Sequence, residues 1–383
     1  MRKSYLVFGQ PPIEQPEVDE VLACLRSAWL GTGPKAAEFE KRIAAYKGVP
    51  YAVGLNSCTA GLHLACVVLG LQPGDEVITT PMTFCATVNA IVHAGATPVL
   101  ADVDPVTMNI DPAQVRRKIT KKTKALLPVH FAGRPCDMDA LMAIAREHQL
   151  KVIEDCAHAI ETEYRGQKAG AIGDLGVLSF YSTKNIVTGE GGMVLTRDEQ
   201  LAKRTKRMGL HGMSADAWKR FTDDGYKHYD VEEIGFKYNL MDLQAAIGMH
   251  QITRVEQYWQ RRLVLWQRYM KELGDLPIGL PAPWASHEKH ALHLFTILVD
   301  KQRCGVSRDE MLMKLHQQNI GTGVHYRSLP NMSVYRRRFG WKPEDYPAAQ
   351  AIGDRTLSLP LTPRLTDDDA GDVIAAVRQA LGA

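Results

Sequence analysis

Helix-like and strand-like segments alternate along the first half of the chain, and this alternation limits the possible folds more than any other feature. From about residue 15 to residue 200, amphipathic helices alternate with short β-rich runs. Such a pattern predicts parallel strands joined by helices that cover both faces of a buried sheet. We therefore expect an α/β fold, a three-layer αβα sandwich with a mainly parallel sheet. Helices are expected at Glu17–Ser27, Ala36–Tyr46, Thr59–Leu69, Thr83–His93, Pro112–Lys118 and Asp137–His148, and strands at Tyr51–Gly54, Glu76–Thr79, Thr97–Asp102, Thr123–Pro128, Lys151–Glu154, Val177–Ser179 and Met193–Thr196.

The C-terminal third of the chain has a different pattern. A long charged amphipathic stretch after Met249, HQITRVEQYWQRRLVLWQRYMKELG, predicts one helix that leaves the α/β region. We therefore expect a large α/β domain at residues 1–250, with an N-terminal arm, and a smaller α+β domain at residues 251–383. The other elements of the smaller domain are expected at Leu294–Val299 (strand), Ser307–Gln318 (helix) and Asp367–Leu381 (helix).

Charge, hydropathy and cysteine spacing exclude several classes of partner. The 383 residues include 46 Lys and Arg against 43 Asp and Glu, and the net charge of +3 is too small to hold nucleic acid or an anionic membrane surface. The N-terminal sequence MRKSYLVFGQPP has too few apolar residues for a signal peptide, and no apolar run approaches the ~18 residues of a membrane span. The seven cysteines are dispersed and never form a C-x-x-C pair. We therefore expect a cytoplasmic protein with no metal, nucleic-acid or membrane partner.

Two charged residues follow predicted strands of the α/β region. Asp155 stands at the end of a strand in VIEDCAHA, and Lys184 follows another strand in VLSFYSTKNIVTGEGG. Ligands of open α/β sheets bind at the carboxyl ends of strands, where a desolvated lysine can lose its proton and act as a nucleophile. A lysine and a carboxylate are what pyridoxal phosphate requires, because the lysine binds the aldehyde and the carboxylate keeps the pyridine nitrogen protonated. Taken alone, such a pair is more often an ordinary pair of exposed charges.

Two further features fit this cofactor, and each has a structural alternative. Asn56, Ser57 and Thr59 precede an apolar helix whose first amides would attract a phosphate, although these residues equally suit a simple helix cap. Phe84 follows another strand and could stack on a planar ring, although a phenylalanine in the core is the usual outcome.

Ten blocks of sequence, in order along nearly the whole chain, resemble the DegT/DnrJ/EryC1/StrS family of sugar-nucleotide aminotransferases. The resemblance implies fold type I of the pyridoxal phosphate-dependent enzymes. A further segment, residues 300–328, is similar to the members of the family that aminate a UDP-linked 4-keto pentose for lipid A. The blocks are GTGPKAAEFE (31–40), NSCTAGLHLA (56–65), PGDEVITTPMTFCATVNAI (73–91), GATPVLADVD (95–104), PVHFAG (128–133), IEDCAHA (153–159), SFYSTKNIVTGEGG (179–192), HG (211–212), GFKYNLMDLQAAIGM (235–249) and LSLPLTP (357–363).

The resemblance implies roles for individual residues. Lys184 matches the catalytic lysine that carries the cofactor, and Asp155 matches the partner of the pyridine nitrogen. Asn239 matches a phosphate ligand donated by the neighbouring subunit, so a homodimer with shared sites is expected. The other cofactor positions are His158 on the side of the ring hydroxyl, Thr59, the amide of Ala60 and Ser179 at the phosphate, and Phe84 as the stacking aromatic.

The implied reaction moves an amino group from L-glutamate to a nucleotide-linked keto sugar, here a 4-keto sugar, for amino-sugar, surface-polysaccharide or antibiotic-sugar biosynthesis. Lys184 would also be the base for the proton transfer. By position, Lys35, His211, His325 and Arg327 are candidate substrate contacts, and each also fits an ordinary solvated or structural role. Two alternatives stay open: a dehydratase of the same family that keeps the lysine, and a non-catalytic sugar-nucleotide sensor.

Overall fold

The computed structural model describes residues 2–214 and 229–383, and its centre is a seven-stranded sheet in the order β1-β9-β8-β5-β4-β2-β3. The β3, β2, β4, β5 and β8 strands are parallel to one another, whereas β9 is antiparallel to both β8 and β1. The expected mainly parallel sheet is therefore confirmed. The strands are β1 (Tyr51–Leu55), β2 (Glu76–Thr79), β3 (Thr97–Leu100), β4 (Thr123–Leu127), β5 (Lys151–Cys156), β8 (Leu175–Ser179) and β9 (Gly192–Thr196).

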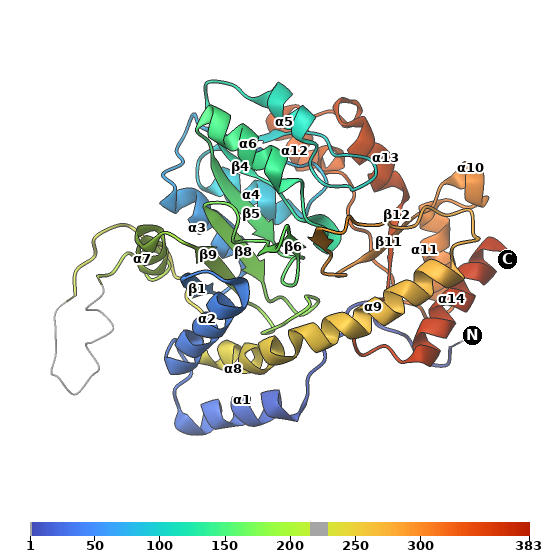
Figure 1. Cartoon of the computed structure of the whole chain (residues 1–383), viewed down its shortest axis with the longest axis horizontal. Coiled ribbons are helices and arrows are strands. Elements are labelled where there is room, and N and C mark those ends of the chain that lie inside the picture. Colours follow the sequence, from blue (N-terminus) through green and yellow to red (C-terminus); the bar gives the residue numbers. More distant parts are fainter. Residues whose placement is uncertain (1, 215–228) are drawn as a thin grey trace.

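Helices cover both faces of the sheet, as the predicted three-layer sandwich requires (Figure 1). Alternate strand residues point to opposite faces. Val77, Ile153 and Val177 pack with α3, α4 and α7, whereas Ile78 and Val152 pack with α5 and α6. Farther along that second face, Leu178 and Leu195 pack with α2 and α8. The helices are α1 (Gln15–Ser27), α2 (Pro34–Lys47), α3 (Cys58–Val68), α4 (Cys85–His93), α5 (Pro112–Lys118), α6 (Met138–His148), α7 (Glu199–Met208) and α8 (Asp242–Gln251).

The prediction that one helix starts after Met249 is wrong, because two helices occupy this region. The α8 helix already begins at Asp242 and ends at Gln251, a 3-10 turn occupies Ile252–Arg254, and α9 runs from Val255 to Glu272. The tighter turn separates two amphipathic faces: α8 packs on the sheet, and α9 crosses the molecule toward α14 (Figure 1). A continuous charged-apolar pattern does not reveal such a break.

The C-terminal part of the chain has its own buried cluster, in which α9 packs with α11, α14 and a two-stranded sheet. The expected strand at Leu294–Val299 is β11, and it pairs antiparallel with β12, a strand that the periodicity did not predict. The N-terminal arm also reaches this part, since Leu6 bridges to Ile320. The division into domains at residue 250 stays a prediction. The remaining elements are β6 (Glu163–Tyr164), β7 (Gln167–Lys168), β10 (Glu288–Lys289), β11 (Phe295–Leu298), β12 (Thr356–Leu359), α10 (Lys301–Cys304), α11 (Arg308–Gln317), α12 (Ser333–Phe339), α13 (Pro347–Arg355), α14 (Asp367–Leu381) and η1, η4 and η5 (Phe131–Gly133, Leu329–Asn331, Pro343–Asp345).

Among the helices of residues 2–214 and 229–383, none combines the length and the apolar character needed to cross a bilayer.

Gly192 brings the first turn of α3 against the sheet. A Cβ atom at this position would overlap the backbone of Ser57 and Cys58, which cannot move aside as a flexible side chain can. The glycine at position 192, the first residue of β9, therefore allows the N-terminus of α3 to lie close to the carboxyl end of β8.

We expect Gly192→Ala to lower the free energy of unfolding by about 1–3 kcal/mol, because overpacking against backbone forces a shift of α3 or β9. Urea denaturation measures this change. Gly31→Ala is the matched control, since a Cβ at Gly31 meets nothing within 4 Å. Equal stabilities for the two variants would show that the close approach is not a constraint.

Candidate active site

Lys184 lies in the turn that follows β8, at the carboxyl end of the sheet. Its backbone N–H donates to the carbonyl of Tyr181 (2.9 Å), which fixes the turn. Desolvation lowers the pKa of the partly buried Lys184 amine to about 8, although nearby Cys58 and Asp155 act in the opposite direction. The amine therefore loses its proton more readily than an ordinary lysine, as a nucleophile must.

Asp155 is buried near the end of β5, the strand next to β8. One carboxylate oxygen accepts from the Ala157 N–H (3.1 Å) and the other from the Thr87 hydroxyl (2.9 Å). Desolvation raises the pKa of Asp155, and these two hydrogen bonds together with the charge of Lys184 oppose the rise. Since each carboxylate oxygen accepts two hydrogen bonds, Asp155 retains room for an N–H of a bound ligand.

The N-terminus of α3 lies at the same edge of the sheet. Ser57 caps the helix by accepting the N–H of Ala60 at 3.1 Å, so this predicted phosphate-binding amide already has a partner within the chain. Thr59 is exposed in the first turn, and the hydroxyl of Ser179, the last residue of β8, accepts from the Tyr181 N–H at 3.4 Å. Helix amides and hydroxyls at a helix N-terminus are suited to a phosphate group.

The Phe84 side chain is exposed, with 60% of its surface open to solvent. It directly precedes α4, and its ring centroid lies 6.3 Å from that of Tyr326. An aromatic ring that is not used in the core is available to stack on a planar ligand, so the position fits the predicted stacking role.

His158 packs among neutral aromatic groups close to Lys184. Its Nδ1 accepts the N–H of Ala132 (3.2 Å), and its Nε2 lies 3.0 Å from the Tyr326 hydroxyl. The His293 ring lies 4.4 Å away between centroids. Desolvation and the charge of Lys184 lower the pKa of both histidines well below the usual value, so both rings are neutral at physiological pH.

A chain of buried polar groups leads from His293 to an ion pair. His293 Nδ1 lies 2.9 Å from the Asn185 side-chain oxygen, and the Asn185 amide donates to Glu161 at 2.7 Å. Glu161 pairs with the guanidinium of Arg262 on α9. Both charged side chains are at most 1% exposed. Because Asn185 directly follows Lys184, this chain anchors the lysine turn to α9.

The predicted substrate contacts are dispersed. His325 lies near Lys184, and its Nδ1 is 2.9 Å from the Ser358 hydroxyl. Lys35 forms an ion pair with Glu20, whereas His211 and Arg327 are exposed. The structure thus brings His325 to Lys184, Asp155 and His158, and it gives Lys35 a partner outside this group.

Six residues at the site were missed by sequence reasoning: Thr87, Glu161, Asn185, Arg262, His293 and Tyr326. Thr87 follows Phe84 by three residues, and Asn185 and Tyr326 are direct neighbours of candidates, so proximity to a candidate was the available signal. The signal for His293 was its neighbour Leu292, which departs from the family pattern near the expected sugar site, whereas Glu161 and Arg262 had no such signal.

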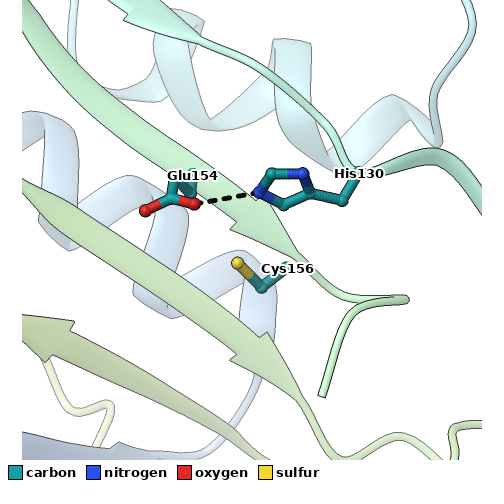
Figure 2. A group of neighbouring side chains, drawn as sticks. All are labelled: His130, Glu154 and Cys156. Carbon is teal, nitrogen blue, oxygen red and sulfur yellow. Dashed lines mark hydrogen bonds and ion pairs between the residues drawn. The ribbon is translucent and has the colours of Figure 1, made fainter. Parts of the chain in front are cut away.

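A second polar cluster, next to Asp155, groups His130, Glu154 and Cys156 (Figure 2). Glu154 accepts from the backbone N–H groups of Gly170, Ile172 and Gly173 and lies 3.0 Å from His130 Nε2. The N–H of Cys136 donates to His130 Nδ1, so Nε2 carries the proton and donates to Glu154. With its nitrogens and carboxylate oxygens used, this cluster is an anchor for loops rather than a ligand set for a metal.

The fold and the site together define the class: an α/β protein with a lysine of lowered pKa and a buried carboxylate at the carboxyl edge of its sheet. The model of the DegT/DnrJ/EryC1/StrS aminotransferase family matches residues 11–378. The chain therefore belongs to this family of aminotransferases, which use pyridoxal phosphate, and the predicted fold, enzyme class and cofactor are confirmed.

Named relatives agree with this assignment. The spore coat polysaccharide biosynthesis protein SpsC of Bacillus subtilis is 47% identical over 379 residues, 98% of this chain and 97% of the relative. The structure of the putative sugar aminotransferase Spr1654 of Streptococcus pneumoniae in its PMP form is 32% identical, with a TM-score of 0.92 and coverage of 98% and 99%. PseC of Helicobacter pylori, an aminotransferase of pseudoaminic acid biosynthesis, is 27% identical, with a TM-score of 0.92 and coverage of 99% and 100%.

We expect Arg262→Met to lower the free energy of unfolding by about 3–5 kcal/mol, because it leaves the Glu161 carboxylate buried without its counter-charge. The double variant Glu161→Met/Arg262→Met should be less destabilised than Arg262→Met alone, since no charge is left unpaired. Urea denaturation measures all of these values. The control is Arg116→Met, at an exposed pair with Glu147, which should cost at most about 1 kcal/mol. If Arg262→Met lowers the free energy of unfolding by no more than this control does, Glu161 does not depend on Arg262 for its counter-charge.

Proposed function

We propose that this aminotransferase moves an amino group from L-glutamate to a nucleotide-linked 4-keto sugar, as a cytoplasmic homodimer. The observation that carries the proposal is the pair at the carboxyl ends of β8 and β5, Lys184 with its lowered pKa and the buried Asp155. The chemistry needs both: an amine that can be deprotonated near neutral pH and a carboxylate that holds a protonated pyridine nitrogen.

The residues at the site fit the cofactor. Asp155 has hydrogen-bonding capacity left for the pyridine N–H, and the first turn of α3 with Ser179 would hold the phosphate. Phe84 offers an exposed ring to stack on the cofactor ring. Bound pyridoxal phosphate supplies an electron sink for the carbon that loses its proton. The Lys184 Nζ would hold the cofactor at rest and, once released from it, would move the proton as a neutral base.

The sugar class is supported by the relatives, among which are a protein of spore coat polysaccharide biosynthesis and a putative sugar aminotransferase. A diphosphate in the acceptor requires cations or hydrogen-bond donors. Arg327 is an exposed cation directly after Tyr326, whereas burial lowers the pKa of His325 to about 4, so His325 would act as a neutral hydrogen-bonding group. Lys35 would contribute a charge that Glu20 already neutralises in part, and His211 an exposed ring.

The homodimer is supported by an apolar stripe on α1. Val18, Leu22 and Leu25 are each at least 40% exposed at helical spacing, and the exposed Trp29 and Leu30 extend the stripe. A patch of this kind typically marks a protein interface. We propose that a second copy of the chain covers it.

Asn239 connects this surface to the site. Its side chain donates to the Thr32 hydroxyl at 2.6 Å, in the loop that follows the stripe. Its backbone bridges to Leu55, at the end of β1. The predicted ligand for the partner's phosphate is therefore anchored to the same loop as the proposed interface.

We expect the purified enzyme to absorb visible light, to lose this absorbance when L-glutamate is added and to regain it with an accepted keto sugar. A panel of UDP-, dTDP- and GDP-linked 4-keto and 3-keto sugars identifies the acceptor. Lys184→Ala should show neither change and should fold normally, because a lysine at a strand end contributes little to the core. Lys203→Ala, at an exposed ion pair with Glu199, is the control.

Three results would contradict the proposal. A purified protein without visible absorbance indicates a sensor. Loss of water from the sugar without amino transfer indicates a dehydratase. If no sugar of the panel restores the visible absorbance, the assignment of a nucleotide-linked keto sugar is wrong. The assignment of the family and of the cofactor is not affected by this result.

We expect a mixture of Lys184→Ala and Asn239→Ala protomers, each inactive alone, to regain activity. Each heterodimer then holds one site with both residues intact and one site with both replaced. Subunit exchange is first verified by native mass spectrometry of protomers with different tags. Heterodimers without activity would show that Lys184 and Asn239 act in the same chain's site.

A further inference from the structure

The hydrogen-bond partners of His158 determine which of its nitrogens carries the proton. Nδ1 accepts the backbone N–H of Ala132, and a backbone amide cannot act as an acceptor there. Since burial keeps the ring neutral, the single proton lies on Nε2. Nε2 therefore donates to the hydroxyl oxygen of Tyr326, 3.0 Å away.

Because His158 is the donor in this hydrogen bond, the phenolic proton of Tyr326 is not used in it. In residues 2–214 and 229–383, the only hydrogen-bonding group found at the Tyr326 hydroxyl is His158 Nε2, and that group is a donor. Tyr326 is held in place from the C-terminal part of the chain, since the preceding carbonyl, of His325, accepts from the Thr356 hydroxyl at 2.9 Å. The Tyr326 hydroxyl is therefore held in place and can donate a hydrogen bond to a ligand.

The surroundings of the phenol indicate which acceptor it meets. Asp155, Cys58 and Cys85 are the other titratable groups that act on Tyr326, and its ring lies 6.3 Å from that of Phe84. Pyridoxal phosphate has three polar points besides its aldehyde: the pyridine nitrogen, the phosphate and the ring hydroxyl. On the proposed function, Asp155 would hold the first, and the α3 N-terminus with Ser179 would hold the second. The hydroxyl lies on the edge of the ring away from the phosphate, and it is the point left without a group.

We propose that Tyr326 donates its phenolic proton to the ring-hydroxyl oxygen of the bound cofactor, and that His158 is a positioning residue that orients Tyr326. Both nitrogens of His158 are used by protein groups, so the contact that the family resemblance assigns to His158 passes to the tyrosine. A donor at this oxygen stabilises its ionised form and lowers its proton affinity.

The test is the pH titration of the visible absorbance of the enzyme-bound cofactor, compared between the wild-type enzyme and Tyr326→Phe. The variant should retain its cofactor and its melting temperature, and its midpoint should rise by about one pH unit, because a hydrogen bond to a charged group contributes about 1.5–3 kcal/mol and one unit corresponds to about 1.4 kcal/mol. The control is Tyr269→Phe, which removes a buried phenol that donates to the Pro360 carbonyl in the C-terminal cluster. Its midpoint should equal that of the wild type.

Variants of His158 separate the two roles. His158→Gln keeps an N–H that can donate to Tyr326 and should titrate near the wild type, whereas His158→Phe should shift in the same direction as Tyr326→Phe. An unchanged midpoint in Tyr326→Phe, with a shift in His158→Phe, would overturn the proposal and return the contact to His158. Unchanged midpoints in both would exclude either residue from the ring hydroxyl. Neither result bears on the sugar acceptor, which the substrate panel tests separately.

Discussion

The anchoring of Glu154 fixes the end of β5, and the geometry of the site depends on it. Neighbouring residues of a strand point to opposite faces, so the side chains of Glu154 and Asp155 lie on opposite faces of the sheet. On one face, three backbone amides and His130 hold the Glu154 carboxylate, and burial alone would otherwise make this charge costly. The hydrogen bonds of that carboxylate keep its pKa low. With β5 fixed in this way, Asp155 accepts a hydrogen bond from Thr87 on the other face and acts on Lys184 through its charge.

The site is built by two parts of the chain that are distant in sequence. Asp155, His158 and Lys184 come from the α/β sheet, whereas Arg262, His293 and Tyr326 come from segments beyond residue 255. The buried pair of Glu161 with Arg262 joins the two parts through α9. The attraction within such a pair adds little net stability, because the desolvation of both charges offsets it. Its position beside the lysine turn links the packing of the C-terminal part directly to the site.

Local pattern was sufficient to predict most of the sheet and its helices, since apolar periodicity is a property of neighbouring residues. The strand-end positions of Asp155 and Lys184 followed from the same pattern. It was not sufficient for β12, whose partners β11 and Gly323 are distant in the sequence, or for the break between α8 and α9. Tyr326 and Arg262 could not be predicted as members of the site, because their partners lie 168 and 101 positions away. Contacts of that kind arise from the tertiary fold alone.

The electrostatics of the site follow from burial as much as from charge. Burial lowers the pKa values of His158, His293 and His325, and it raises those of Cys58 and Tyr326, so each of these groups is neutral near pH 7. Beside these neutral groups, the Lys184 amine and the Asp155 carboxylate are the two site groups that can carry a charge. In a region of low dielectric, the field of one carboxylate is screened little. The histidines and the phenol therefore act on a ligand through the direction of their hydrogen bonds, and the backbone amide of Ala132 sets that direction for His158.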